Sequence, residues 1–154
     1  MIEYIVTDPC YILPDNIWDQ CCKSLDDGFE VFNETVSKAL AEFSGCQAWA
    51  CDTGYGDWNN EIFGCNVKKS DFCADAGMVC ICQLSDKIKD YIEQHYDTIF
   101  FSGAAVFEMS DNISVEFNQN CRDWTVITIK DKTYGNTITS TSVSDYYSED
   151  EEEY

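Results

Sequence analysis

The longest regular pattern of apolar residues lies between positions 29 and 43. Its apolar members are Phe29, Phe32, Val36, Leu40 and Phe43. Because they recur every three or four residues, they share one face of an α-helix, and polar side chains occupy the opposite face. The pattern therefore predicts a helix over 29–43 that ends at Gly45 and buries this stripe in the core.

Two shorter helices are also indicated. The first opens after Pro14 and carries Trp18. The second covers 87–96, and Ser85 is placed to cap it by accepting a hydrogen bond from its first turn. His95, the only histidine of the chain, would then lie near the C-terminus of this helix, where a positive charge suits the helix dipole.

Strands are expected both before and between these helices. Residues 2–6 are β-branched or aromatic, which predicts a strand. Further strands are expected over 46–51, 63–67 and 76–82, and the last of these is apolar throughout, as in a buried strand. A polar loop that contains two glycines, 52–60, separates the first two of them.

The C-terminal third alternates apolar runs with short turns. Residues 99–109 and 113–117 flank a Ser-Asp-Asn sequence, which predicts a β-hairpin. Residues 124–129 and 134–140 predict a second strand pair. Helices early in the chain and hairpins late in it indicate an α+β fold, with a largely antiparallel sheet on which two or three helices pack.

Charge changes this picture most. The chain has 154 residues and a formal net charge of −20, from nine Lys and Arg against 29 Asp and Glu. The last ten residues hold six of the acids and no base, so the remainder still carries −14. We expect a single globular domain over 1–143, which is long enough to bury a core, and an acidic, mobile tail over 144–154.

The charge also narrows the classes of partner. A strongly anionic surface repels nucleic acid and anionic lipid and attracts basic surfaces. Lys68-Lys69 is the only adjacent basic pair, so direct binding of DNA or RNA is disfavoured. No apolar run approaches the roughly 20 residues needed to span a bilayer, and the N-terminus does not resemble a signal peptide. We expect a cytoplasmic protein.

Ten cysteines suggest disulfides or zinc, but neither is favoured. Without an export signal the cytosol would keep most of them reduced, and the paired CxxC ligands typical of structural zinc sites are absent from the sequence. Cys80 and Cys82 alternate along a predicted strand and should pack as small hydrophobes. No metal or cofactor is therefore predicted, while disulfides formed on oxidation remain an open alternative.

Two sets of residues are candidates for a functional site. The acids expected to form an anionic docking surface are Glu30, Glu34, Glu42, Asp57, Glu61, Glu93, Glu108 and Glu116. The polar groups expected to form a small-ligand site, where a turn near residue 9 would meet the glycine loop, are Asp8, Cys10, Asp52, Asp57 and Asp75. No catalytic set is identified, because nothing in the sequence pairs His95 with one of the ten cysteines.

Four stretches carry a resemblance to known proteins. They are Tyr4-Ile5-Val6-Thr7-Asp8-Pro9-Cys10-Tyr11, the Trp18-containing helix, Thr53-Gly54-Tyr55-Gly56-Asp57 and Asp75-Ala76-Gly77. Together they resemble a group of small, poorly characterised proteins of bacteria and their phages, over about the first 85 residues. The resemblance implies a β-rich fold in which the Asp-Pro-Cys-Tyr turn lies close to the Gly-Asp loop. It implies no activity, and the usual Gly-Asp-Gly appears here as Gly56-Asp57-Trp58.

Three functions stay open at this point. The favoured one is a non-enzymatic, phage-type inhibitor whose anionic surface mimics nucleic acid and occupies the basic surface of a host defence protein, such as a nuclease, in the host cytoplasm. The second is a small ligand- or metal-binding protein, or a hydrolase, with its site at the Asp8–Cys10 turn and the Asp57 loop. The third is a structural or virion-associated protein whose charge maintains solubility.

Overall fold

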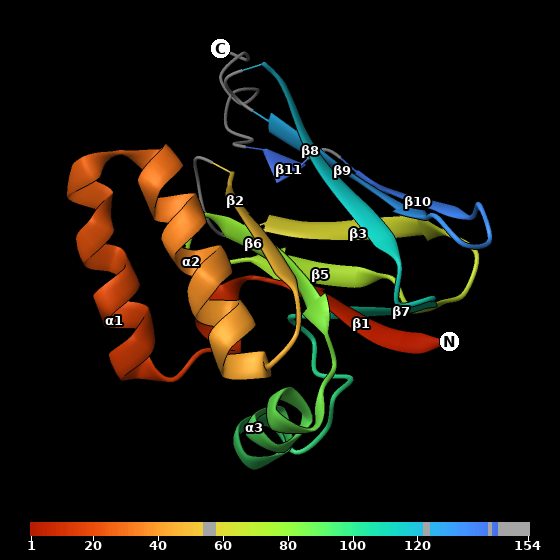
Figure 1. Ribbon diagram of the computed structural model, residues 1–154, viewed down its shortest axis with the longest axis horizontal. Helices are drawn as coiled ribbons and strands as arrows, with labels where there is room; N and C mark the ends of the chain where they lie inside the picture. Colours follow the sequence, from red (N-terminus) through yellow and green to blue (C-terminus); the bar gives the residue numbers. More distant parts are fainter. Residues whose placement is uncertain (54–57, 122–123, 142, 145–154) are drawn as a thin grey trace, which may run out of the picture.

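The computed structural model describes residues 1–53, 58–121, 124–141 and 143–144. Its elements form three layers, with helices on one face of a five-stranded sheet and a six-stranded sheet on the other face (Figure 1). The strand pairs in both sheets are antiparallel. The predicted α+β class is therefore confirmed, and the antiparallel strands are divided between two stacked sheets.

Three helices make up the first layer. They are α1 (Asp15–Lys23), α2 (Phe29–Ser44) and α3 (Asp86–Tyr96). In α2 the predicted stripe is buried at Phe32, Val36 and Leu40, whereas Phe29 at its start is 54% exposed. Gly45, with a φ of 79°, ends this helix in the left-handed conformation that a glycine adopts without strain.

Short turns set the ends of the helices. Two 3-10 turns, η1 (Pro9–Tyr11) and η2 (Ser24–Asp27), lead from the first strand towards α1 and from α1 to α2. Ser85 caps α3 as predicted, since its Oγ accepts a hydrogen bond from the backbone N–H of Ile88 at 3.4 Å. His95 lies in the last turn of α3, and its Nδ1 is 2.8 Å from the carbonyl oxygen of Tyr91.

The five-stranded sheet is the middle layer. Its strands, in spatial order, are β2 (Ala48–Asp52), β6 (Met78–Gln83), β1 (Ile2–Thr7), β7 (Ala105–Met109) and β4 (Val67–Lys69). Residues 78–82 of β6 are all buried, because one face of the sheet meets the helices and the other meets the second sheet. This double coverage explains the continuous apolar run that the sequence shows there.

The six-stranded sheet is the outer layer. Its strands are β11 (Val143–Ser144), β9 (Trp124–Asp131), β10 (Thr137–Ser140), β3 (Trp58–Gly64) and β5 (Asp71–Ala74), together with β8 (Ile113–Cys121), which pairs with β9. The predicted pairing of 124–129 with 134–140 is confirmed as β9 and β10, in which Ile129 lies opposite Ile138.

Two hydrophobic cores hold the three layers together. Between the helices and the middle sheet, Ile5 and Val106 of the sheet share a core with helix residues such as Val36 and Ile88. The core between the two sheets is formed by buried residues of both, among them Val6, Phe72, Phe107 and Ile129. Cys80 and Cys82 of β6 lie in the first core with no exposed surface, as small hydrophobes are expected to do.

One predicted strand is wrong. The sequence predicts a strand over 63–67, but β3 ends at Gly64 and β4 begins at Val67. Between them the chain turns at Asn66, which has a φ of 63°. Asparagine tolerates this left-handed conformation better than most residues, and that turn chemistry was missed in the sequence.

The predicted hairpin between 99–109 and 113–117 is also wrong. Only residues 105–109 form a strand, and β7 lies in the middle sheet whereas β8 lies in the outer sheet. The intervening Ser110 is held by the other sheet, since Asp131 accepts hydrogen bonds from its backbone N–H at 2.9 Å and its Oγ at 2.7 Å. A sequence cannot show this long-range contact, which converts a hairpin turn into a crossing between sheets.

In the part of the chain that the structure describes, no helix is both long and apolar enough to cross a membrane.

Candidate functional site

The turn at Asp8 ties the end of β1 to the start of β6. Asp8 has no exposed surface, and its Oδ1 accepts a hydrogen bond from the backbone N–H of Cys10 at 3.0 Å. Its Oδ2 accepts hydrogen bonds from the backbone N–H groups of Ala76, at 2.6 Å, and Met78, at 3.3 Å. Both carboxylate oxygens are therefore engaged by the main chain.

These contacts determine the protonation of the turn. Burial raises the pKa of Asp8, and the hydrogen bonds from Cys10, Ala76 and Met78 oppose that rise. Burial also raises the pKa of the Cys10 thiol, and the nearby charges of Asp8 and Asp75 raise it further. Because the thiolate is the nucleophilic form of cysteine, this environment disfavours the nucleophilic form of Cys10.

The predicted small-ligand set is only partly brought together. Asp75 is exposed and lies near enough to Asp8 and Cys10 for its charge to affect the Cys10 thiol. Asp52 lies on β2, where its Oδ1 accepts a hydrogen bond from the Asn33 side chain of α2 at 2.8 Å. Asp57 lies outside the described residues, so the expected approach of its loop to the turn stays a prediction.

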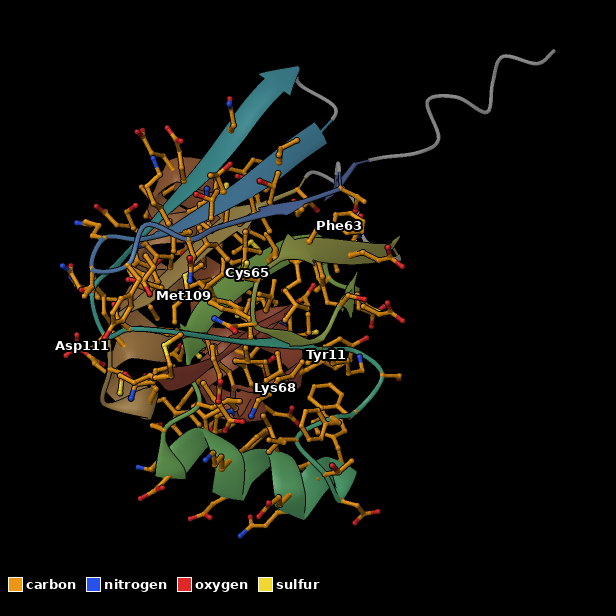
Figure 2. All side chains as sticks on the ribbon, turned by 90° about the vertical axis from the view of Figure 1, so that its right-hand side faces the viewer. Tyr11, Phe63, Cys65, Lys68, Met109 and Asp111 are labelled. Atoms are coloured by element: carbon orange, nitrogen blue, oxygen red, sulfur yellow. The ribbon has the colours of Figure 1, made fainter. Side chains whose placement is uncertain are left out.

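Aromatic rings enclose the same turn. The Tyr96 hydroxyl of α3 donates a hydrogen bond to the carbonyl oxygen of Tyr11 at 2.8 Å, and Phe101 stacks on Tyr96 with a centroid distance of 4.2 Å. A Cβ on Gly103 would lie 2.9 Å from the Tyr11 ring, so any larger residue there would force this ring to shift. Figure 2 shows Tyr11 on the side of the middle sheet that faces α3. The turn is therefore held both by its hydrogen bonds and by the packing of these rings, which indicates a structural role.

Within the described residues, no group of three or more His, Cys, Asp or Glu side chains is arranged to hold a metal ion. Nine cysteines are free thiols, namely Cys10, Cys21, Cys22, Cys46, Cys51, Cys65, Cys73, Cys80 and Cys82. Burial raises the pKa of Cys82 to about 12 and that of Cys80 well above its ordinary value. These two thiols are protonated at neutral pH, as befits core residues.

The acids predicted to form a docking surface divide between two layers. Four of them lie on the helices and are exposed: Glu30, Glu34, Glu42 and Glu93. Glu61 and Glu116 are exposed on β3 and β8 of the outer sheet. Glu108, on β7, forms a 3.1 Å salt bridge with Lys68, and Asp57 lies outside the described residues.

The helical layer carries more exposed acids than the four predicted for the docking surface. All of its acids are exposed, and they are Asp15, Asp19, Asp26, Asp27, Glu30, Glu34, Glu42, Asp86, Asp90, Glu93 and Asp97, the last being the C-cap residue of α3. Only four lysines, Lys23, Lys38, Lys87 and Lys89, belong to the same elements. We call these eleven acids the anionic helical layer.

Few of these charges are neutralised from within the molecule. In residues 1–53, 58–121, 124–141 and 143–144, the salt bridges are Lys68–Glu3, Lys68–Glu108 and Lys89–Glu3. None of them involves an acid of the anionic helical layer. Lys87, a lysine of α3, lies over the Phe43 ring at 5.3 Å. The carboxylates of this layer therefore face solvent without an ion-pair partner in the described part of the chain.

Sequence reasoning missed seven of the eleven acids, although a signal for them was present. Each lies on a helix, its cap or η2, and away from the apolar stripes that the sequence identified. Assigning every charged residue of the predicted helices to the polar face would have selected Asp15, Asp19, Asp86 and Asp90. The remaining acids, at 26, 27 and 97, required knowledge of how the connecting turns are placed.

Comparisons with family models, curated proteins and solved structures found no match for this chain.

Proposed function

We propose that this protein is a non-enzymatic interaction protein that docks onto a basic surface of another protein through its anionic helical layer. The observation that supports the proposal most directly is that the eleven acids of this layer are all exposed and none takes part in a salt bridge of the described residues. A surface of one sign attracts a surface of the opposite sign and steers its approach.

Helix stability explains only part of the placement of these acids, because Asp15, Glu30 and Asp86 lie in the first turns of their helices, where a negative charge suits the helix dipole. Asp15 and Asp19, Glu30 and Glu34, and Asp86 and Asp90 are each four residues apart, and therefore neighbours on one helix face. Like charges at this spacing destabilise an isolated helix by roughly 0.2–0.5 kcal/mol per pair. Helix-end effects do not account for the second acid of each pair or for the acids of η2, and the proposal assigns these charges to an external cationic partner.

The partner that we propose is a nucleic-acid-binding protein. Arginine and lysine side chains that contact phosphates can bind carboxylates through the same charge-assisted hydrogen bonds, and arginine can do so through two parallel bonds. Rows of exposed carboxylates could therefore occupy a groove built for a phosphate backbone. A phage-type inhibitor of a host defence nuclease is the particular case suggested by the sequence resemblance, and it belongs to this proposal.

Two charge-reversed variants test the proposal. Glu30→Lys/Glu34→Lys alters the helical layer, and Glu61→Lys/Glu116→Lys makes the same charge change on exposed positions of the outer sheet. Each variant and the wild type would be used to capture proteins from a bacterial lysate at low salt. We expect a nucleic-acid-binding protein that is captured by the wild type and the sheet variant, that is lost with the helix variant, and whose nucleic acid is displaced by the wild type.

The same experiment includes a variant that lacks residues 145–154. Removal of these residues takes away six acids but leaves a charge of −14, so capture should persist. Binding should also weaken steeply between low and physiological salt, because attraction between exposed charges is screened. Equal loss of capture with both charge-reversed variants, or an affinity that does not change with salt, would refute the proposal.

A further inference from the structure

We infer that the corner between α1 and α2 is the anchor of this interface, and that Leu25 and Phe29 enter an apolar pocket on the partner's basic surface. The inference rests on the proposed function and locates the centre of the contact. It commits to one occupant, a cationic protein surface that also presents apolar side chains.

The apolar stripes of both helices extend past the core at this corner. On α1 the stripe passes through Trp18 and Cys21 and continues into η2 at Leu25, which is 41% exposed. On α2 the stripe that buries Phe32 begins one turn earlier at Phe29, which is 54% exposed. Trp18 and Phe32 pack together with a centroid distance of 6.0 Å, so the covered part of the two stripes ends just before the corner.

Exposure of large apolar side chains is concentrated here. Among the residues whose side-chain exposure the structure describes, they are Met1, Leu25, Phe29, Val31, Phe63, Phe100 and Tyr134. Three of these seven fall within positions 25–31, whereas the other four are scattered over the remaining chain. The ring of Phe29 also packs against the buried ring of Phe32, at a centroid distance of 6.5 Å. This contact restricts the orientation of the exposed ring. A supported, exposed aromatic side chain is typical of interface hot spots.

Acids surround this apolar corner. Asp26 and Asp27 follow Leu25, and Glu30 and Glu34 lie on the first turns of α2, all four being exposed. An apolar centre within a charged rim is the usual composition of a specific interface. These four acids outnumber the one exposed base nearby in sequence, Lys23 of α1, and a second copy of this chain, with its own charge of −20, would be repelled. The charges of this corner therefore favour a basic protein as the partner over a second copy of this chain.

The position of the corner between α1 and α2 in the molecule also supports its role as the anchor of the interface. Figure 1 shows the link between α1 and α2 at an outer corner of the molecule, on the helical side and away from both the middle sheet and α3. A projecting corner can insert side chains into a concave surface, and nucleic-acid-binding grooves are concave and basic. Phe29 would then occupy the pocket while the surrounding acids pair with the groove's Arg and Lys side chains.

Two synthetic peptides of equal length and charge serve as probes. One alternates lysine with leucine, and the other alternates lysine with serine. We expect Phe29→Ala to weaken binding of the lysine–leucine peptide about tenfold and to leave binding of the lysine–serine peptide unchanged. The matched control is Phe63→Ala, which truncates a phenylalanine that is 53% exposed on β3 of the outer sheet (Figure 2). Both variants should keep the wild-type circular dichroism spectrum.

Failure of this inference can be told apart from failure of the proposed function. If Phe29→Ala and Phe63→Ala weaken the lysine–leucine peptide equally, or if neither does, the apolar anchor is refuted. If Glu30→Lys/Glu34→Lys and Glu61→Lys/Glu116→Lys weaken the lysine–serine peptide equally, the helical layer is not a docking face and the proposed function fails. Leu25→Ala provides a second anchor variant, and it should also act on the lysine–leucine peptide alone.

Discussion

Asp8 and Asp131 are both fully buried, yet the pKa values of their carboxyl groups shift in opposite directions. For Asp8, burial outweighs three hydrogen bonds from backbone N–H groups, and the pKa is raised. For Asp131, burial alone would raise the pKa, but hydrogen bonds from Ser110, Tyr134 and Thr133 hold it below the ordinary value. The balance between desolvation and donors differs, although the residue type is the same.

Replacement of Asp8 by alanine should destabilise the protein. The substitution removes the acceptor of three backbone N–H groups, those of Cys10, Ala76 and Met78. The Met78 group is buried, and leaving it unsatisfied costs about 1–3 kcal/mol. Urea unfolding monitored by circular dichroism would measure the loss. Asp75→Ala is the control, since Asp75 is exposed and should change the free energy of unfolding by no more than about 0.5 kcal/mol. Equal effects of the two substitutions would show that the Asp8 carboxylate does not stabilise the turn that connects β1 to β6.

Asp131 should make stability depend on pH. The pKa of Asp131 is lowered in the folded protein, so its stabilising effect is present above the unfolded value of roughly 3.9 and is lost as the pH falls through the folded value. Asp131→Asn should therefore destabilise the protein by about 1–3 kcal/mol near neutral pH. The difference from wild type should narrow in acid, as urea unfolding at several pH values would show. A difference that stayed constant with pH would contradict the assignment, and Asp111→Asn, at an exposed position, is the control.

The outer sheet depends on close approach of two strands at Gly64. A Cβ at Gly64 of β3 would lie 2.6 Å from the backbone carbonyl oxygen of Thr137 and 2.7 Å from the Ile138 side chain of β10. A side chain there must push the two strands apart, because the nearest atom belongs to the backbone. The pairing of β3 with β10 is what joins the N-terminal and C-terminal strands of this sheet.

Gly64→Ala should therefore destabilise the protein more than Gly135→Ala. A Cβ at Gly135 would meet no heavy atom within 4 Å, so only its left-handed φ of 84° opposes substitution, at a cost of roughly 1–2 kcal/mol. Urea unfolding of the two variants gives the comparison directly. If Gly135→Ala were the more damaging substitution, the close approach of β3 and β10 would not matter for stability.

The elements themselves were predictable to different degrees. Periodicity identified α2 almost to the residue, because sixteen residues give the pattern several turns in which to repeat. The four-residue β5 was missed and the strand over 63–67 was misplaced, because such short segments contain too few residues to show a period. Which strands pair with each other was the hardest property to predict from the sequence. For example, β7 and β8 follow each other along the chain but lie in different sheets.

The charge of the whole molecule should oppose folding at low ionic strength. With a net charge of −20, the compact state suffers self-repulsion that the expanded chain relieves. Salt at about 0.15 M shortens the screening length to roughly 8 Å. We therefore expect the free energy of unfolding to rise as NaCl is added from low concentration to this value, in contrast to a protein stabilised by surface ion pairs.

Neutralised variants show where the repulsion originates. Asp26→Asn/Asp27→Asn/Glu30→Gln removes three charges from the corner between α1 and α2, so its stability should respond less to NaCl than that of the wild type. Urea unfolding across a salt series measures both responses. A wild-type stability that is independent of NaCl would mean that the carboxylates lie too far apart to repel one another.

For the whole molecule, the sequence by itself determined the α+β class and the excess of negative charge. It also determined the three helices with their buried faces and the burial of Cys80 and Cys82. These properties follow from composition and from local periodicity, which each segment carries within itself. The candidate acids on α2 were accessible for the same reason, since the polar face of a helix is fixed once its apolar face is known.

Only the tertiary structure decided the rest. The division of the strands between two sheets depends on contacts such as that between Ser110 and Asp131, which are far apart along the chain. Contacts between distant parts of the chain also decide that both oxygens of the Asp8 carboxylate accept hydrogen bonds. They decide as well that Phe29 is exposed, although it continues an apolar stripe that is buried further along α2. Burial, satisfaction of polar groups and gathering of charge are properties of residues that meet in space, so a one-dimensional pattern does not contain them.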